Sequence, residues 1–257
     1  MDTSMYHAFA AVESRHWWFQ GRRRIVAGLL RDHLDDRRPA RPGGLNILDV
    51  GSGTGEMVEM LREFGTVTAL DSSPHAIDYL RQRLPEGVSA RHGSIPEDLP
   101  RDETFDLVTA FDVVEHLEDD LGALRAFRQV LPTGGRMALT VPAHQMLWSH
   151  HDVYAGHFRR YSRARLSDLV HRAGGFQVER LAHFNSLLFL PALAARTAGR
   201  WRRRVAPPVA EQVDPHLAVP APLVNRFLLG VFSSEAHLLS HVDPPFGVSL
   251  VALCRAC

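Results

Sequence analysis

Residues 45–56 have the composition and spacing of a loop that binds a ligand through its backbone. An apolar run that contains Asp49 leads into three glycines at every second position, Gly51, Gly53 and Gly55, and an amphipathic helical pattern follows at once. A strand that turns into a helix over glycines leaves bare backbone N–H groups at the helix N-terminus, where no Cβ keeps a ligand away. The stretch therefore predicts a cofactor-binding loop.

Apolar runs separated by helical patterns surround this loop. Apolar residues recur at helical spacing over residues 19–35, and Ser72, Ser73 or Pro74 can begin another helix that runs to Leu84. The other runs predict strands at residues 45–50, 67–71, 88–91, 105–111, 136–141, 176–183 and 248–254. Strands that alternate with helices over short connections indicate an α/β fold with a doubly wound, parallel sheet.

The second half of the chain is less regular. Residues 142–161 predict a long polar and aromatic loop, after which Ser162 begins a helix that Gly174 and Gly175 end. Residues 184–243 show little strand character, with a helix expected around 223–239. We therefore expect a core built from residues 45–183 and 244–257, a helical N-terminal lid from residues 1–44, and an insertion or lid from residues 184–243.

Composition narrows the class of protein. The 257 residues carry 29 Lys and Arg against 29 Asp and Glu, so no overall charge attracts nucleic acid, and we expect no nucleic-acid partner. The N-terminus shows no basic region followed by an apolar run, which predicts no signal peptide and a cytoplasmic location. The two cysteines, Cys254 and Cys257, lack a second ligand pair, so we expect plain thiols and no metal site.

The spacing of the glycines distinguishes between cofactors. A nicotinamide-binding loop has G-x-G-x-x-G, whereas Gly51, Gly53 and Gly55 form G-x-G-x-G. Together with Asp71 after the second strand and Phe111-Asp112 after the fourth, this pattern resembles the class I S-adenosylmethionine-dependent methyltransferases. The resemblance covers residues 45–183 and implies a Rossmann-like, seven-stranded, mostly parallel sheet. Beyond the core, the chain resembles the bacterial branch with a Trp-Trp-Phe start, here residues 17–19, and a His-x-Arg-Arg-Tyr segment, here residues 157–161.

The resemblance implies the residues that would hold S-adenosylmethionine. Asp71 would accept hydrogen bonds from both ribose hydroxyls, since a carboxylate matches paired donors. Asp49 would orient the loop and the amino group of the cofactor, and the adenine would lie against Ser94 and Ile95, where many relatives have an acid in place of Ser94. A simple helix-capping role is the alternative for Asp71 and Asp112. The full expected set is Asp49, Gly51, Ser52, Gly53, Gly55, Asp71, Ser72, Ser94, Ile95, Phe111 and Asp112.

Methyl transfer from a sulfonium is a direct displacement, so holding the two reactants in line is the main task of the enzyme. Positioning contributes effective molarities of about 10⁵–10⁸ M, whereas a general base adds about 10²–10⁴-fold. A histidine near pKa 6.5 is suited to take a proton from an acceptor hydroxyl or amine. The catalytic candidates are therefore Asp112, His116, His151 and His157, with ordinary structural roles as the alternative for each histidine.

The acceptor would contact the less regular segments. Trp17 and Trp18 form either an aromatic wall of the site or part of a lid helix packed on the domain. Arg159 and Arg160 suit a phosphate or carboxylate on the acceptor, or else one of them pairs with Asp152 or Asp168 to fasten the loop. The substrate-binding candidates are Trp17, Trp18, His144, Arg159, Arg160 and Tyr161.

Residues 184–204 combine an apolar stretch with clustered arginines and are too short to span a bilayer. This segment fits either peripheral contact with an anionic membrane surface or an ordinary lid or homodimer contact. We predict an S-adenosylmethionine-dependent methyltransferase that modifies oxygen, nitrogen or carbon of a small-molecule or carrier-linked acceptor, which the arginines suggest is anionic. The alternatives are a catalytically silent protein that binds the cofactor or a partner, and a nicotinamide-dependent oxidoreductase, which the glycine spacing disfavours.

Overall fold

The computed structural model describes residues 10–34, 43–83, 87–205, 218–239 and 241–257, with the side chains of residues 199–205 excepted. The end of the expected helix at Leu84, the side chains of the Arg200–Arg204 cluster and the start of the expected N-terminal lid lie outside these residues. A seven-stranded sheet forms the centre, in the order β3-β2-β1-β4-β5-β7-β6. The strands are β1 Leu45–Val50, β2 Gly65–Asp71, β3 Val88–His92, β4 Leu107–Phe111, β5 Arg136–Pro142, β6 Phe176–Phe184 and β7 Ser249–Ala256.

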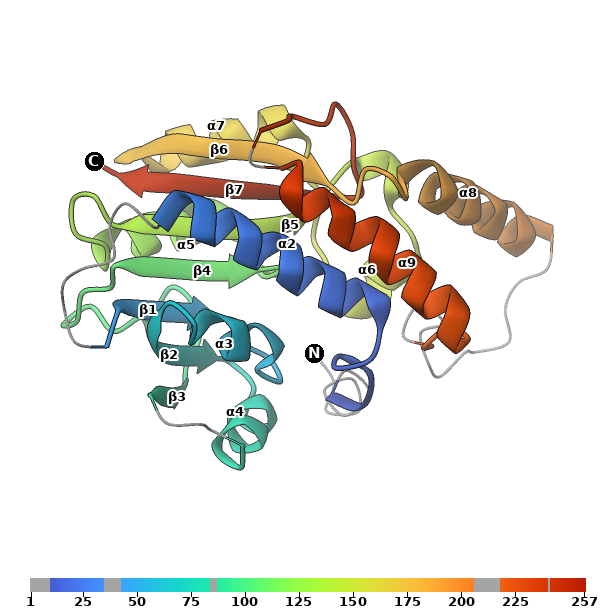
Figure 1. Cartoon of the computed structure of the whole chain (residues 1–257). Helices are drawn as coiled ribbons and strands as arrows, with labels where there is room; N and C mark the ends of the chain where they lie inside the picture. The colour runs from blue at the N-terminus through green and yellow to red at the C-terminus, as the bar shows by residue number, and fades with distance from the viewer. Residues whose placement is uncertain (1–9, 35–42, 84–86, 206–217, 240) are drawn as a thin grey trace.

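The strands β1 to β5 are parallel, and β7 runs antiparallel to both β5 and β6. β1 pairs with β2 on one side and with β4 on the other, so the strand order reverses at β1 (Figure 1). Ligands of open α/β sheets bind beside the carboxyl ends of the strands at such a reversal. The expected α/β, Rossmann-like, mostly parallel sheet is confirmed.

Helices cover both faces of the sheet. Their bounds are α2 Trp17–Leu34, α3 Glu56–Leu61, α4 Pro74–Arg81, α5 Asp120–Gln129, α6 His150–Ala155, α7 Arg163–Ala173, α8 Phe189–Val205 and α9 Pro222–Ser234, with short 3₁₀ turns η2 Val114–His116, η3 Gln145–Leu147 and η5 Glu235–His237. Apolar residues of α2, α3 and α4 share one buried cluster with one face of the sheet, and those of α5 and α7 share another with the opposite face. Within the described residues, no helix is long and apolar enough to cross a membrane.

The region predicted as a continuous loop, residues 142–161, instead contains η3 and α6. Ser149 begins α6 because its backbone N–H donates to the Asp152 carboxylate at 2.8 Å, which is half of a capping box. Gly156 ends the helix in a left-handed conformation, with φ +75°. The six residues of α6 bury only Asp152 and Ala155 and so show no apolar period, unlike the equally short α3, which buries Met57, Met60 and Leu61; this is why the prediction was wrong here.

The N-terminal helix and the insertion pack on each other. Phe232 of α9 is fully buried against α2 and the sheet, and Figure 1 shows α9 lying along α2. The Asn225 side chain accepts from the backbone N–H of Trp17 at 2.9 Å and donates to the Arg15 carbonyl at 2.8 Å. These contacts join the two segments that the sequence predicts as lids, and they place both beside the carboxyl ends of the strands.

Candidate active site

A cavity of about 820 Å³ lies where the carboxyl ends of β1, β2, β4 and β5 meet the insertion. Most of the residues that the sequence predicts for the cofactor line it: Asp49, Gly51, Ser52, Gly53, Asp71, Ser72, Ser94, Ile95, Phe111 and Asp112. These residues come from separate strand ends, and the topology brings them together because parallel strands end at the same edge of the sheet. The remaining one, Gly55, does not line the cavity.

The glycine loop offers bare backbone to the cavity. Gly53 has φ +52°, and a Cβ built there meets no atom within 4 Å, so the side-chain position faces open space. Gly55 has φ +91°, and a Cβ there would lie 2.4 Å from Leu80 Cδ2, so its role is close packing of the loop on α4. Gly53 thus provides room for a ligand, whereas Gly55 allows the loop to turn.

Asp71 connects the end of β2 to the glycine loop. Its carboxylate accepts from the backbone N–H of Gly53 and from that of Ser73, both at 2.8 Å, and the residue is buried. An ionised carboxylate is an acceptor on both oxygens, which suits a ligand with paired hydroxyls. Asp71 is therefore held against the loop and has the acceptor chemistry that a ribose diol requires.

Asp49 lies beneath the loop in a buried position. Thr109 Oγ1 donates to its carboxylate at 2.6 Å. Burial raises the pKa of Asp49 to about 7, against the hydrogen bonds from Thr109 and Ser52 that lower it. A carboxyl with this pKa is sensitive to any positive charge that a ligand brings into the cavity.

The outer part of the cavity is lined by Ser94 and Ile95. The backbone N–H of Ser94 donates to the Asp98 carboxylate at 2.8 Å, and Ile95 packs partly on the core. Phe111, at the end of β4, also lines the cavity and is buried. The bare loop, the fixed carboxylate of Asp71 and two apolar side chains fit a ligand with a ribose and a flat base, which S-adenosylmethionine has.

Asp112 has a backbone conformation that is uncommon outside glycine, with φ +57°. Its backbone N–H donates to the Thr140 carbonyl at 2.9 Å, and its carboxylate pairs with the guanidinium of Arg22. Arg22 also contacts Glu56 at 2.9 Å and lies with its guanidinium carbon 4.7 Å from the centre of the Trp18 ring. Burial alone would lower the pKa of Arg22, but the charges of Asp112 and Glu56 outweigh burial and raise this pKa above its usual value. This buried arginine ties α2 to both sides of the cofactor loop.

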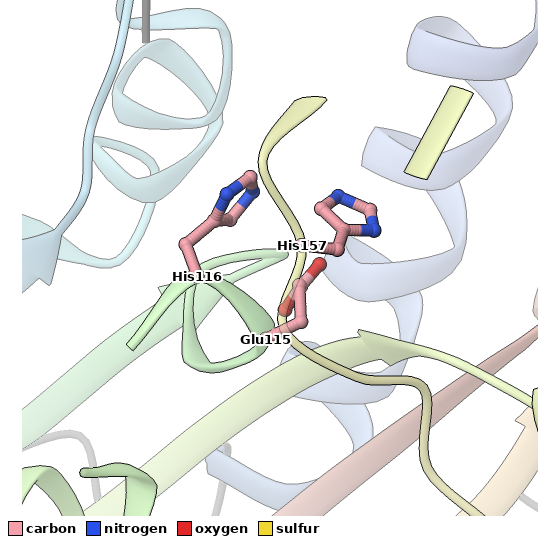
Figure 2. A group of neighbouring side chains, drawn as sticks. All are labelled: Glu115, His116 and His157. Atoms are coloured by element: carbon pink, nitrogen blue, oxygen red, sulfur yellow. The ribbon is translucent and has the colours of Figure 1, made fainter. Parts of the chain in front are cut away.

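Two of the predicted catalytic histidines, His116 and His157, meet in the cavity together with Glu115 (Figure 2). The two imidazole rings have centroids 4.6 Å apart and an interplanar angle of 88°. Burial lowers the pKa of His116 to about 4, so the ring is neutral at pH 7. Burial, with the nearby Asp112 charge, raises the pKa of Glu115 well above its usual value. The third histidine, His151, also lines the cavity, with its ring 6.0 Å from that of His157.

The two arginines of the Arg-Arg-Tyr segment differ in whether they line the cavity. Arg160 lines the cavity but is buried in an ion pair, with Nε 2.7 Å from Asp152 Oδ1. Arg159 does not line it; its guanidinium donates to the carbonyls of Leu117 and Glu118 and lies 2.8 Å from Asp120. The pairing of Arg160 with Asp152 is the loop-fastening alternative that the sequence left open.

Two other substrate candidates also lie outside the cavity lining. Tyr161 is fully buried and donates its hydroxyl to Asp120 at 2.9 Å. His144 stacks on His183, with ring centroids 4.9 Å apart. Their contacts hold the segment between β5 and α7 in place.

Apolar side chains from outside the cofactor loop form one wall of the cavity. Trp17 and Trp18 line it from the start of α2. The insertion contributes the remainder of the wall through Leu188, Pro191, Ala192, Ala195 and Leu228, and Val248 lies next to them at the start of β7. The cavity is thus polar at the strand ends and more apolar where the N-terminal helix and the insertion meet, although His16 and Arg196 also line it there.

Several cavity residues had no role in the sequence analysis, among them Glu13, Arg22, Glu56, Glu115 and Asn185. Arg22 has a signal in the sequence, because it shares a helix face with Ile25, Val26 and Leu29 at spacings of three, four and seven. An arginine on an apolar face needs a buried partner. Glu115 gives no such signal, since nothing near it in sequence distinguishes a buried acid from an exposed one.

Comparisons with known proteins agree with this geometry. The family model described as a methyltransferase domain matches residues 20–181, more than half of the chain. A ubiquinone biosynthesis O-methyltransferase of Xanthomonas campestris pv. campestris (strain B100) is 34% identical over 140 residues, which are 51% of this chain and 58% of that protein. The chain therefore spans less than two thirds of the length of the curated relatives it matches.

Solved structures share the fold over most of the chain. A chain of the complex between the Haloferax volcanii Trm112 methyltransferase activator and a methyltransferase has a TM-score of 0.60 at 19% identity, covering 98% of this chain and 94% of that one. A SAM-dependent methyltransferase from Archaeoglobus fulgidus has a TM-score of 0.54 at 18% identity, covering 91% and 94%. At such identities these two structures support the fold alone. The family match and the cofactor loop together identify the chain: it belongs to the class I S-adenosylmethionine-dependent methyltransferases, the family whose cofactor is S-adenosylmethionine.

Proposed function

We propose that this protein methylates a hydroxyl group of a small or carrier-linked acceptor whose body is largely apolar. The observation that carries this proposal is the position of Glu115, His116 and His157, which line the same cavity as the cofactor loop and the apolar wall. Oxygen is favoured over nitrogen and carbon because the curated relative is named an O-methyltransferase. The matched region covers about half of the chain, so the nature of the acceptor rests on the cavity itself.

The residues expected from the sequence are assigned to the cofactor as a set. Asp71 holds the ribose hydroxyls, the backbone of Gly51 to Gly53 lies against the methionine part, and Asp49 faces its amino group. Ser94 and Ile95 contact the adenine, and Phe111 and Asp112 border the position of the methyl group. When bound, S-adenosylmethionine supplies an activated methyl group on a sulfonium leaving group.

The acceptor has two parts, and different residues bind each part: Glu115, His116 and His157 bind its hydroxyl, and the apolar wall binds its body. The hydroxyl points to Glu115, His116 and His157, where a neutral imidazole and a buried carboxyl can accept its hydrogen bond. Trp17, Trp18 and the insertion enclose the apolar body and exclude water from the reacting oxygen. Most of the rate enhancement then comes from positioning.

For residues 184–204 we propose the lid alternative. Leu188, Pro191, Ala192 and Ala195 line the cavity, so this segment contributes directly to the site. If this lid carries part of the acceptor site, the apolar stretch has a role in the cavity, and no membrane contact is needed to explain it. Absence of sedimentation with anionic vesicles at low salt is the expected result, and salt-sensitive sedimentation would favour peripheral membrane contact instead.

Calorimetric titration with S-adenosylhomocysteine tests the assignment of the cofactor. We expect nanomolar to micromolar binding, and Asp71→Ala weakens it by at least about 100-fold, because hydrogen bonds to a charged group contribute about 1.5–3 kcal/mol each. Asp78→Ala, an exposed acid on the following helix, is the matched control and leaves the affinity unchanged. Tight binding of NADH in place of S-adenosylhomocysteine would contradict the proposal.

Turnover tests the rest of the proposal. Incubation with S-adenosylmethionine and fractions of a cell extract that contain hydroxylated apolar compounds should release S-adenosylhomocysteine, with the methyl group recovered as an ether. Cofactor binding without product in any fraction would instead favour the catalytically silent alternative.

A further inference from the structure

Glu115, His116 and His157 form a cluster with the composition of a metal site. One ligand atom from each residue lies within 4.8 Å of those of the other two, and Figure 2 shows the three side chains gathered from η2 and from the segment after α6. Ligands bound to one ion at about 2.0–2.2 Å lie no more than about 4.4 Å apart. Small side-chain rotations therefore suffice to bring all three onto a single ion.

Glu115 provides an independent indication that something binds here. The side chain is fully buried, and both carboxylate oxygens lack a hydrogen-bond partner among the described residues. A buried carboxylate without a partner is costly, and such groups in native proteins are usually explained by a bound ion, water or a catalytic role. A cation between Glu115 and the two imidazoles would satisfy it.

The surroundings of His157 resemble those of a metal-binding histidine. Its Nδ1 lies 3.0 Å from Asp152 Oδ1, which leaves Nε2 for a ligand. Asp152 is itself held by Arg160 Nε at 2.7 Å and by the backbone N–H of Ser149 at 2.8 Å. Metal-binding histidines commonly donate their second N–H to a carboxylate in this way, which fixes the ring orientation and the tautomer.

We propose that Glu115, His116 and His157 bind a divalent first-row transition-metal ion, with Zn²⁺, Fe²⁺ and Mn²⁺ as the class. Two imidazoles and one carboxylate suit these ions, whereas Ca²⁺ and Mg²⁺ favour oxygen ligands throughout. Three protein ligands leave coordination positions open towards the cavity. This extends the proposed function and rests on it: the acceptor hydroxyl takes an open position in place of its hydrogen bond to these side chains, its pKa falls, and its proton passes to bulk water before the apolar residues close over the acceptor. This proposal differs from the sequence analysis, which expects no metal site.

Metal binding is measured directly on the untagged full chain after treatment with a chelator. Titration with Co²⁺, followed by its visible absorption, and with Zn²⁺ by calorimetry should show one ion per chain. Glu115→Gln and His157→Ala each lower the affinity by at least 100-fold. Asp152→Asn lowers it by about 10- to 100-fold, as expected for a group that orients a ligand. Glu118→Gln and His171→Ala, an exposed acid and an exposed histidine outside the cluster, are the matched controls and change nothing.

Titration of the same metal-free samples with S-adenosylhomocysteine confirms that each variant is folded and separates the two proposals. Equal affinity of the wild type and of Glu115→Gln and His157→Ala for Co²⁺ would overturn the metal site. So would methyl transfer at the full rate in the chelator, and either result would leave the proposed function intact. Loss of S-adenosylhomocysteine binding in the wild type would instead refute the proposed function.

Discussion

At the scale of single residues, the site combines charges that are costly to bury with contacts that hold them in place. Arg22 is buried between Asp112 and Glu56, and Asp71 is fixed by two backbone N–H groups. Asp49 is different, because its hydrogen bonds from Thr109 and Ser52 and the charge of Arg22 do not outweigh the effect of burial on its pKa. Its ionisation therefore affects both the free energy of unfolding and the binding of the cofactor.

The raised pKa of Asp49 predicts how stability depends on pH. The pKa is 3.8 in the unfolded chain and about 7 in the folded one, so the folded state holds the proton more tightly between these values. The free energy of unfolding therefore falls as pH rises from about 4 to 7 and then stays level. Each unit of difference between the two pKa values corresponds to 1.36 kcal/mol, so the total decrease is about 4 kcal/mol.

Replacing Asp49 with Asn removes this titration. Chemical denaturation of the cofactor-free protein at pH 5 and pH 8 should show a loss of about 2–3 kcal/mol in the wild type that is missing from Asp49→Asn. The affinity for S-adenosylmethionine should rise with pH through 7 in the wild type alone, because the positive ligand favours the ionised carboxyl. Identical pH dependence of stability in the two proteins would show that Asp49 is ionised throughout.

At the scale of elements, α2 positions the site through its contact with α9. Gly21 of α2 faces Phe232, and a Cβ at Gly21 would lie 2.2 Å from Phe232 Cδ1. Gly28, two turns further along the same helix, has ordinary space, since a Cβ there would lie 3.5 Å from the Ala236 carbonyl oxygen. Substitution at Gly28 therefore reports on helix propensity, and substitution at Gly21 reports on packing within the same helix.

We predict opposite effects of the same substitution at the two glycines. Gly28→Ala raises the free energy of unfolding by about 0.5–1 kcal/mol, because alanine is the better helix former. Gly21→Ala lowers it by about 1–3 kcal/mol, because the buried ring of Phe232 must move. Adding Phe232→Leu to Gly21→Ala should cost less than the sum of the two single changes. Denaturant titrations of the four variants measure this, and stabilisation by Gly21→Ala would mean that α9 adjusts freely.

Elements with a clear apolar pattern were predictable from the sequence, and α6, which has none, was not. The buried strands are mostly apolar runs, and Ser73 and Ser162 cap the helices they precede, each accepting from a backbone N–H three residues on. α6 was missed because its residues show no apolar period and its cap depends on Asp152, which also holds Arg160 and His157. A residue with three partners from one loop is a tertiary feature that local patterns do not reveal.

At the scale of the whole molecule, the cofactor half and the acceptor half of the cavity differ in how far the sequence could predict them. The glycine loop and Asp71 lie in local motifs, so their positions follow from the fold. The acceptor side joins α2, η2, the segment around α6 and the insertion, which are far apart in the chain. Glu115 and His157 meet only because β4 and β5 are neighbours in the sheet.

This division predicts that the insertion can be altered without loss of the cofactor. Ala195 of α8 lines the cavity, whereas its neighbour Ala194 does not, and both residues are exposed. Ala195→Trp fills part of the acceptor side, so we expect at least a tenfold rise in KM for the acceptor identified from the extract, with unchanged affinity for S-adenosylhomocysteine. Ala194→Trp adds the same bulk outside the cavity lining and should change neither value. If both variants bind and turn over like the wild type, α8 is only a cover, and the acceptor lies against α2 and the histidine cluster alone.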